Sequence, residues 1–266
     1  MTDVIVDDNA PDGGMASPAG GELNEEAEQG RSLRRAAYLT IGLGVAFSLL
    51  YFLSYFLLQQ TPGPEATDAE IIAFYGAGGQ RRLILIGLYV MPFAGIAYLW
   101  FIVALRMWIA NSARRINPLL SNVQLVSGVI FIGLLFTAAA ASAATAASME
   151  YVQGVVDPMF ARQLPLLSST ILLVFAMRMA AMFVFTTSNI GRATGLLPRW
   201  FIYLGFVVGL FLLLSATFNK LLALVFPLWV LCLCAIMFLR AREIPPEAVV
   251  PPVSRNHTDR NTKTKS

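Results

Sequence analysis

Charged residues are scarce in this chain of 266 amino acids. Asp, Glu, Lys and Arg together account for 13% of the sequence, whereas they make up roughly a quarter of an ordinary soluble domain. A soluble protein of this length needs a polar surface, and too few polar side chains are present to build one. Apolar residues account for 57%, and most of them fall in runs long enough to cross a bilayer. The composition therefore predicts an all-α fold, a polytopic bundle of transmembrane helices.

Ionisable groups are almost missing from the apolar runs. The runs contain no histidine, aspartate or glutamate, and the single histidine, His257, lies near the end of the sequence. Without histidine the runs lack the usual ligands of haem and of many metal sites. Without carboxylates they lack the usual proton relay of pumps, and no phosphate-binding loop or nucleophile elbow is present. We expect a protein that has no cofactor or metal and is not an enzyme.

Cysteine is also rare. Cys232 and Cys234, the only two, lie in the same apolar run. Side chains two residues apart on a helix point to nearly opposite sides, so these two thiols cannot form a disulfide with each other. We interpret both as small packing residues.

The net charge of +3 is distributed in a way that argues against nucleic acid as a partner. Residues 1–30 contain eight acids and no base, and most of the arginines lie directly beside the apolar runs. Arginines in such places orient helices and contact anionic lipids. Membrane lipids are therefore the expected partners.

Six apolar runs have the length and composition of membrane helices. The predicted helices span residues 36–58, 83–105, 122–146, 166–190, 200–218 and 221–239. The first reaches about 34 Å at 1.5 Å per residue, against a hydrocarbon core of about 30 Å. The last two share an apolar stretch whose only charge is Lys220, and this stretch is about twice as long as the core is thick. The chain must therefore turn at Asn219 and Lys220. Pro92 and Pro227 predict kinks in the second and sixth helices.

The remaining segments are predicted to be tails and loops around a membrane domain at residues 36–242. Residues 1–35 form an acidic tail, and residues 243–266 form a Pro-rich and then basic tail. We expect both tails to be disordered, because neither can bury enough apolar area to fold. In the loop after the first helix, Thr67 and Glu70 have the spacing of a capping box, which predicts a short amphipathic helix at the membrane surface.

Lys and Arg residues are shared unevenly between alternate loops. If the amino terminus is cytoplasmic, ten of them lie in cytoplasmic segments near the helices and four lie in the outer segments. The bias predicts that both termini are cytoplasmic, an N-in/C-in topology. Arg81 and Arg82 are exceptions on the outer side, and we expect them beside Glu65, Asp68 or Glu70.

Arg178 is the most informative single residue. It falls twelve residues inside the fourth predicted helix, about 18 Å deep. A charge at the centre of a membrane helix costs at least about 2.5–3.5 kcal/mol on insertion scales, and such residues usually face a bundle interior or a cavity. Glu150, the nearest acid in the sequence, lies beyond the outer end of the third helix and is out of reach.

We therefore expect Arg178 to point inward and to bond hydroxyl and carbonyl oxygens. Ser48, Tyr98 and Thr137 lie at a similar predicted depth and are the candidate partners, and the carbonyl freed by Pro92 is another. Three interpretations remain open: a structural link between helices, a binding site for an anionic headgroup or carboxylate, and a helix boundary placed wrongly.

Small residues predict close helix packing in two segments. Residues 137–148 read TAAAASAATAAS, and side chains this small predict a position at the centre of the bundle. Gly205 and Gly209 form a GxxxG pattern on the fifth helix. Their contact partner is either within the bundle or in a second copy of the chain, which would make a homo-oligomer.

Several short motifs resemble a family of proteins. They are the entry Arg35-Ala-x-Tyr38, the restart after Arg81-Arg82, and the turn Gly195-Leu-Leu-Pro-Arg-Trp200 leading into Phe201-Ile-Tyr-Leu-Gly205. Together they resemble a bacterial family of six-helix inner-membrane proteins catalogued as a domain of unknown function. The resemblance covers residues 34–240 and implies six helices and a multi-pass location in the bacterial plasma membrane. It implies no substrate and no site residues, and Arg178 is not part of its pattern.

Two functions from different classes fit these features. The first is a non-catalytic membrane component that binds lipids or partner proteins. The second is a transporter or permease component for a small anion or amphiphile, with Arg178 as its anchor. Pro92 and Pro227 do not correspond in a repeat of three helices plus three, which weakens the second. A water-accessible cavity that reaches Arg178 would favour transport, whereas a dry bundle would favour the first.

Overall fold

The computed structural model describes residues 18–63, 65–112, 117–152, 155–215 and 219–243. Within these ranges the chain is helical with short connections, and it contains no strand, in agreement with the all-α prediction. Residues 1–17 and 244–266 of the predicted tails lie outside the described part.

The helices follow one another closely along the chain. Their bounds are α1 (Pro18–Leu58), α2 (Asp68–Gly76), α3 (Gly78–Ser112), α4 (Pro118–Ala147), η1 (Ser148–Val152), α5 (Pro158–Thr170), η2 (Ile171–Ala176), α6 (Met177–Thr194), α7 (Arg199–Leu214) and α8 (Leu222–Glu243). Helix α1 includes residues 18–35, which the sequence assigned to a disordered tail. The Glu and Ala residues of that segment are good helix formers and continue the helix backwards from the membrane domain.

Among the described residues, five helical segments are long and apolar enough to cross a membrane. They are Arg35–Leu58, Gly78–Ala110, Pro118–Val152, Pro158–Thr194 and Leu222–Arg242. Helix α7 is equally apolar, but its 16 residues reach only about 24 Å. The chain is therefore a multi-pass integral membrane protein with five such spans and one shorter apolar helix, where the sequence predicted six full spans.

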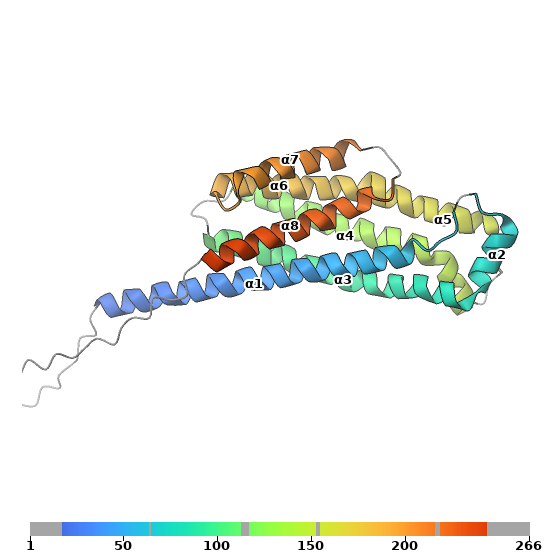
Figure 1. Ribbon diagram of the computed structural model, residues 1–266, viewed down its shortest axis with the longest axis horizontal. Helices are drawn as coiled ribbons and strands as arrows, with labels where there is room; N and C mark the ends of the chain where they lie inside the picture. Colours follow the sequence, from blue (N-terminus) through green and yellow to red (C-terminus); the bar gives the residue numbers. More distant parts are fainter. Residues whose placement is uncertain (1–17, 64, 113–116, 153–154, 216–218, 244–266) are drawn as a thin grey trace, which may run out of the picture.

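The spanning helices lie alongside one another in a long bundle (Figure 1). Helix α1 packs on α3 and α8, α4 packs on α3, α5 and α6, and α7 packs mainly on α6. Helices α1 and α8 are antiparallel: the hydroxyls of Ser48, Tyr51 and Tyr55 donate in turn to the carbonyls of Pro227 (3.2 Å), Ala223 (3.0 Å) and Lys220 (2.7 Å).

The bond from Tyr51 compensates for a proline. Pro227 has no N–H, so the carbonyl four residues earlier, that of Ala223, loses its intrahelical partner. In a membrane such a carbonyl must find another donor, and the Tyr51 hydroxyl supplies it. The first helix thus supplies the hydrogen-bond donor that the Ala223 carbonyl lacks because of Pro227.

At one end of the bundle, some helices extend further than others. The end of α1 is level with the start of α8, where Tyr55 donates to the Lys220 carbonyl, and with Ser142 of α4, which donates to the Leu58 carbonyl at 3.3 Å. Helix α4 and η1 continue about ten residues past Ser142, which is about 15 Å. We call this extension the cap: it consists of α2, residues 78–86 of α3, residues 143–152, and residues 155–168. In Figure 1 it forms the right-hand end, with α2 lying across it.

Five fully buried aromatic side chains fill the middle of the bundle. They come from five different helices: Phe47, Tyr98, Phe131, Phe183 and Phe226. Centroids of neighbouring rings lie 4.6–6.2 Å apart, and Phe226 contacts all four of the others. We call this group the aromatic cluster. The small residues 137–148 follow the cluster along α4 towards the cap, and Ala138, Ala139, Ala143 and Ala146 among them are buried.

The GxxxG pattern packs inside the bundle. A Cβ atom on Gly205 would lie 2.0 Å from the Ser188 Oγ, and one on Gly209 would lie 3.1 Å from the Phe185 ring. Both neighbours belong to α6, so the two glycines let α6 and α7 approach closely. In this structure their contact partner is the chain itself.

Candidate functional site

Arg178 follows directly on the π-helical turn η2. Its Nη1 donates to the Leu173 carbonyl at 2.9 Å, and its Nη2 donates to the Ser215 carbonyl at 3.4 Å. Ser215 caps the carboxyl end of α7, where unpaired carbonyls and the helix dipole favour a cation. Within the described residues no carboxylate pairs with Arg178. The arginine therefore joins α6 to the end of α7.

Arg178 lies on the cap side of the aromatic cluster, five residues before Phe183, or about 7.5 Å along the helix. It precedes the end of α6 at Thr194 by sixteen residues, or about 24 Å, in a hydrocarbon layer of about 30 Å. The prediction placed the fourth helix at 166–190, whereas the helix runs without a break from Pro158 to Thr194. The guanidinium reaches the carbonyl end of α7 through the long arginine side chain.

The three predicted partners of Arg178 have other contacts. Ser48 Oγ donates to the carbonyls of Gly44 and Pro227. Thr137 is exposed and donates to the Gly133 carbonyl in its own helix. Tyr98 belongs to the aromatic cluster, and its buried hydroxyl has no hydrogen-bond partner among the described residues. The structure therefore does not bring Arg178, Ser48, Tyr98 and Thr137 together as one site.

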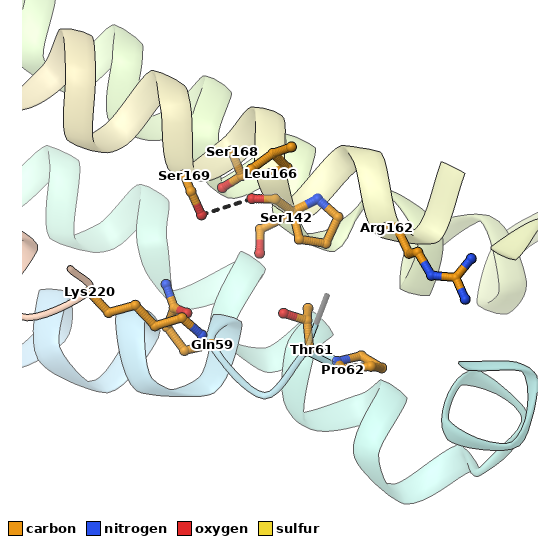
Figure 2. Close-up of a pocket in the computed structure, with 11 residues that line it drawn as sticks. Gln59, Thr61, Pro62, Ser142, Arg162, Leu166, Ser168, Ser169 and Lys220 are labelled. Carbon is orange, nitrogen blue, oxygen red and sulfur yellow. Dashed lines mark hydrogen bonds between the residues drawn. The ribbon is translucent and has the colours of Figure 1, made fainter. Parts of the chain in front are cut away.

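A polar pocket that the sequence did not predict lies at the base of the cap (Figure 2). We call it the cap pocket, and its volume is about 240 Å³. Its lining comes from the end of α1 and the following loop, from α4, from α5, and from the residues before α8: Gln59, Thr61, Pro62, Gly63, Ser142, Arg162, Pro165, Leu166, Ser168, Ser169 and Lys220. Seven of these eleven side chains are polar or charged.

The two cations of the cap pocket have different surroundings. Arg162 donates through Nη2 to the Asp68 carboxylate and to the Ala66 carbonyl at 2.8 Å. Figure 2 shows its guanidinium pointing away from Ser169 and Lys220. Lys220 is exposed, and no carboxylate of the described residues lies within ion-pair distance of it. The pocket therefore carries one uncompensated positive charge.

Serine hydroxyls form the opposite wall of the pocket. Ser168 Oγ donates to the Ala138 carbonyl at 2.7 Å, and Ser169 Oγ donates to the Pro165 carbonyl at 2.9 Å. Ser142 makes the longer bond to Leu58. No motif links the lining residues of the cap pocket, because they come from four separate segments that only the fold brings together. The one sequence signal was Lys220, the only charge in its apolar stretch.

Two ion pairs hold the cap in place. Arg81 donates from Nε to Glu150 at 2.7 Å and from Nη1 to the Tyr75 carbonyl at 3.3 Å, and Arg162 pairs with Asp68. We expected Arg81 beside Glu65, Asp68 or Glu70, which was wrong because η1 brings Glu150 within reach. Both ion pairs connect parts of the cap that are far apart in sequence.

The predicted capping box of α2 is confirmed. The Glu70 carboxylate accepts from the Thr67 backbone N–H at 2.7 Å, while the Thr67 hydroxyl accepts from the Glu70 N–H at 3.4 Å. The hydrogen bonds from Thr67 hold the pKa of Glu70 below its usual value. The start of α2 is therefore fixed by its own sequence.

Neither a protein-family model, nor a curated protein, nor a solved structure matches this chain. The helices show a multi-pass membrane protein. What it does has to follow from the aromatic cluster, Arg178 and the cap pocket.

Proposed function

We propose that this chain is a non-catalytic component of the bacterial plasma membrane that binds lipids or partner proteins. The observation that carries the proposal is the aromatic cluster. A solute that crosses the bundle needs a polar path through its middle, and five buried rings from five helices occupy that region. A dry, closely packed centre favours a binding component over a permease.

The surroundings of Arg178 support the same proposal. A substrate anchor needs free N–H donors that face a cavity, whereas two nitrogens of this guanidinium donate to carbonyls of η2 and of the end of α7. Arginine is well suited to this role, because its planar head can serve two acceptors at once. We therefore assign Arg178 to linking helices.

We also propose six crossings with both termini in the cytoplasm. Helices α1 and α8 are antiparallel, so the start of α1 and the end of α8 lie on the same side if both helices cross. That arrangement requires an even number of crossings, which makes α7 the sixth despite its length. The excess of Lys and Arg in the segments on that side favours the cytoplasm, and the family resemblance implies the bacterial plasma membrane.

The proposed partners are membrane lipids and protein subunits, including further copies of the chain. Helix α7 is the most exposed to such contacts, because it packs mainly on α6. Its outer face carries the exposed side chains Trp200, Tyr203, Val207 and Leu214. In a bilayer this face contacts acyl chains or a neighbouring apolar helix.

Native mass spectrometry of the full chain, extracted directly into nanodiscs, tests the proposed function. We expect defined lipids or a stoichiometric subunit to remain after the bulk lipid has been stripped. The Arg178→Leu variant, provided it is folded, should retain the same species. A bare monomer would contradict the proposal, and a small anion that is held by the wild type and lost from this variant would favour the transporter.

A further inference from the structure

The cap pocket lies at the level where membrane meets water. Helix α1 ends and helix α8 begins beside it, and Gln59 and Lys220 are the first polar residues beyond their apolar runs. Leu166 and Leu221 flank this level and are 62% and 65% exposed. A molecule in the pocket would therefore have its polar part among hydroxyls and its apolar part against leucines.

The electrostatics of the pocket favour an anion. Asp68 neutralises Arg162 and holds it against α2, so the local excess of charge is that of Lys220. No carboxylate occurs among the lining residues. A lysine ammonium at a membrane boundary attracts anionic headgroups, because part of the surrounding water is replaced by protein and lipid.

The donors of the pocket match the oxygens of a phosphate group. Figure 2 shows the Lys220 side chain lying along Gln59, with Ser142 and Ser169 on the facing wall. The Lys220 ammonium and the Gln59 amide can each donate to a phosphate oxygen, and the bond from the charged donor is the stronger. The hydroxyls of Ser142 and Ser169 already donate to the carbonyls of Leu58 and Pro165, so they make the facing wall polar without adding a free donor. The volume of about 240 Å³ accommodates a headgroup and leaves the acyl chains outside.

From these observations we infer that the cap pocket binds the phosphate-bearing headgroup of a phospholipid from the leaflet on the cap side, with Lys220 as the principal contact. The inference rests on the proposed lipid-binding function and names its site and ligand class. Arg162 acts as a positioning residue, because its bonds to α2 fix the wall of the pocket.

A pair of matched lipids tests the inference. Full-length protein in detergent is titrated with phosphatidylglycerol or with diacylglycerol of the same acyl chains, and bound lipid is measured by native mass spectrometry. The wild type should prefer the phospholipid. Lys220→Gln should weaken phosphatidylglycerol binding about tenfold, the loss of one charge-assisted contact, whereas Lys220→Arg should preserve most of it.

Arg82→Gln is the control variant. Arg82 is also an exposed cation at the cap end, but it does not line the pocket, so this variant should bind phosphatidylglycerol like the wild type. Equal binding by Lys220→Gln and Arg82→Gln would overturn the inference, and so would equal binding of the two lipids by the wild type. All variants change exposed side chains, and unchanged melting temperatures would show that they are folded.

Competition with inorganic phosphate shows whether the bound anion is a phospholipid headgroup or free phosphate. If phosphate alone displaces phosphatidylglycerol at equal concentration, the site binds free phosphate and the lipid assignment is wrong. If Lys220→Gln binds phosphatidylglycerol as well as the wild type does, and all variants still retain defined lipids, the cap pocket is not the lipid site. The proposed lipid-binding function then stands. If no variant retains any lipid or subunit, the proposed function fails as well.

Discussion

The middle of the bundle and the cap hold their helices together by different interactions. In the middle, Phe226 packs against four other buried rings. In the cap, ion pairs join Arg81 to Glu150 and Arg162 to Asp68. The boundary between the two regions lies where α1 ends and α8 begins, and the cap pocket is found there.

The difference follows from the solvent on each side of that boundary. Inside a bilayer, lipid tails are as apolar as the side chains, so helices associate through close packing and not through the exclusion of water. An uncompensated charge there is costly. Beyond the boundary, water solvates the outer parts of charged side chains, and half-buried ion pairs can orient a short helix such as α2. Changes in the middle should therefore alter global stability, and changes in the cap should act locally.

Truncating the centre of the aromatic cluster should have the largest effect. Phe226→Ala leaves a cavity among four rings, and we expect the free energy of unfolding to fall by about 3 kcal/mol, the lower end of the range for buried Phe, because lipid replaces water in the unfolded reference. Thermal unfolding in a fixed detergent measures it. Leu228→Ala, an exposed position on the same helix, is the control, and an equal loss in both variants would refute the central role of the cluster.

Adding one methyl group between α6 and α7 should have the next largest effect. Gly205→Ala places a Cβ 2.0 Å from Ser188 Oγ, and such overpacking costs about 1–3 kcal/mol. The melting temperature should fall, and it should partly recover in the double variant Gly205→Ala/Ser188→Ala. Gly42→Ala is the control, because nothing lies within 4 Å of its added Cβ. An unchanged Gly205→Ala protein would mean that the two helices are further apart.

Removing a buried hydroxyl should raise stability slightly. Tyr98 is fully buried among rings, and its hydroxyl finds no partner in the described residues. An unsatisfied buried hydroxyl costs about 1 kcal/mol or more, so Tyr98→Phe should raise the melting temperature. Tyr51→Phe should lower it, because Tyr51 donates to the carbonyl freed by Pro227. Destabilisation by Tyr98→Phe would indicate that the hydroxyl has an acceptor.

Breaking one ion pair of the cap should have a local effect. Glu150→Gln removes the charge that holds Arg81, whose side chain is 19% exposed. Hydrogen exchange of the α2 amides should become several-fold faster, while exchange in α8 stays unchanged. Arg82→Gln, which removes an exposed charge from the next residue, should leave both unchanged. If α8 also exchanged faster in Glu150→Gln, the cap and the bundle would be one cooperative unit.

Acid should produce the smallest effect, again confined to α2. The pKa of Glu70 is lowered from 4.5 in the folded state, so its contribution is fully present above about pH 4.5. It is lost as the pH falls through the lowered pKa. The difference in amide protection of α2 between the wild type and Glu70→Ala, corrected for intrinsic exchange, should disappear over that interval. A constant difference down to low pH would exclude the carboxylate as its source.

Length and composition were enough to predict the five long apolar helices, but not the shortness of α7 or the cap. Residues 158–165 read PMFARQLP and fall between the third and fourth predicted helices, in a segment interpreted as an outer loop. In the structure Asp157 caps the helix and Pro158 occupies its first turn, where a proline costs nothing. The helix therefore starts eight residues earlier than predicted.

The cap pocket could not be predicted from the sequence for a different reason. Gln59, Ser142, Ser169 and Lys220 are separated by dozens of residues, and each has an ordinary explanation at a membrane border. Only the packing of α1, α4, α5 and α8 decides that they face one space. Arg178 was a different case, because its type and position in an apolar run predicted hydroxyl and carbonyl acceptors, of which the structure shows two carbonyls and none of the three named hydroxyls.

The hydroxyl bonds between α1 and α8 have a consequence for assembly in the membrane. The first helix enters the bilayer early in synthesis, while its acceptors, the carbonyls of Lys220, Ala223 and Pro227, are translated more than 160 residues later. Until then the hydroxyls of Tyr51 and Tyr55 face either lipid or a temporary partner. A chain released before α8 inserts therefore displays unpaired hydroxyls within the bilayer, a feature by which membrane chaperones and proteases can distinguish it from the finished bundle.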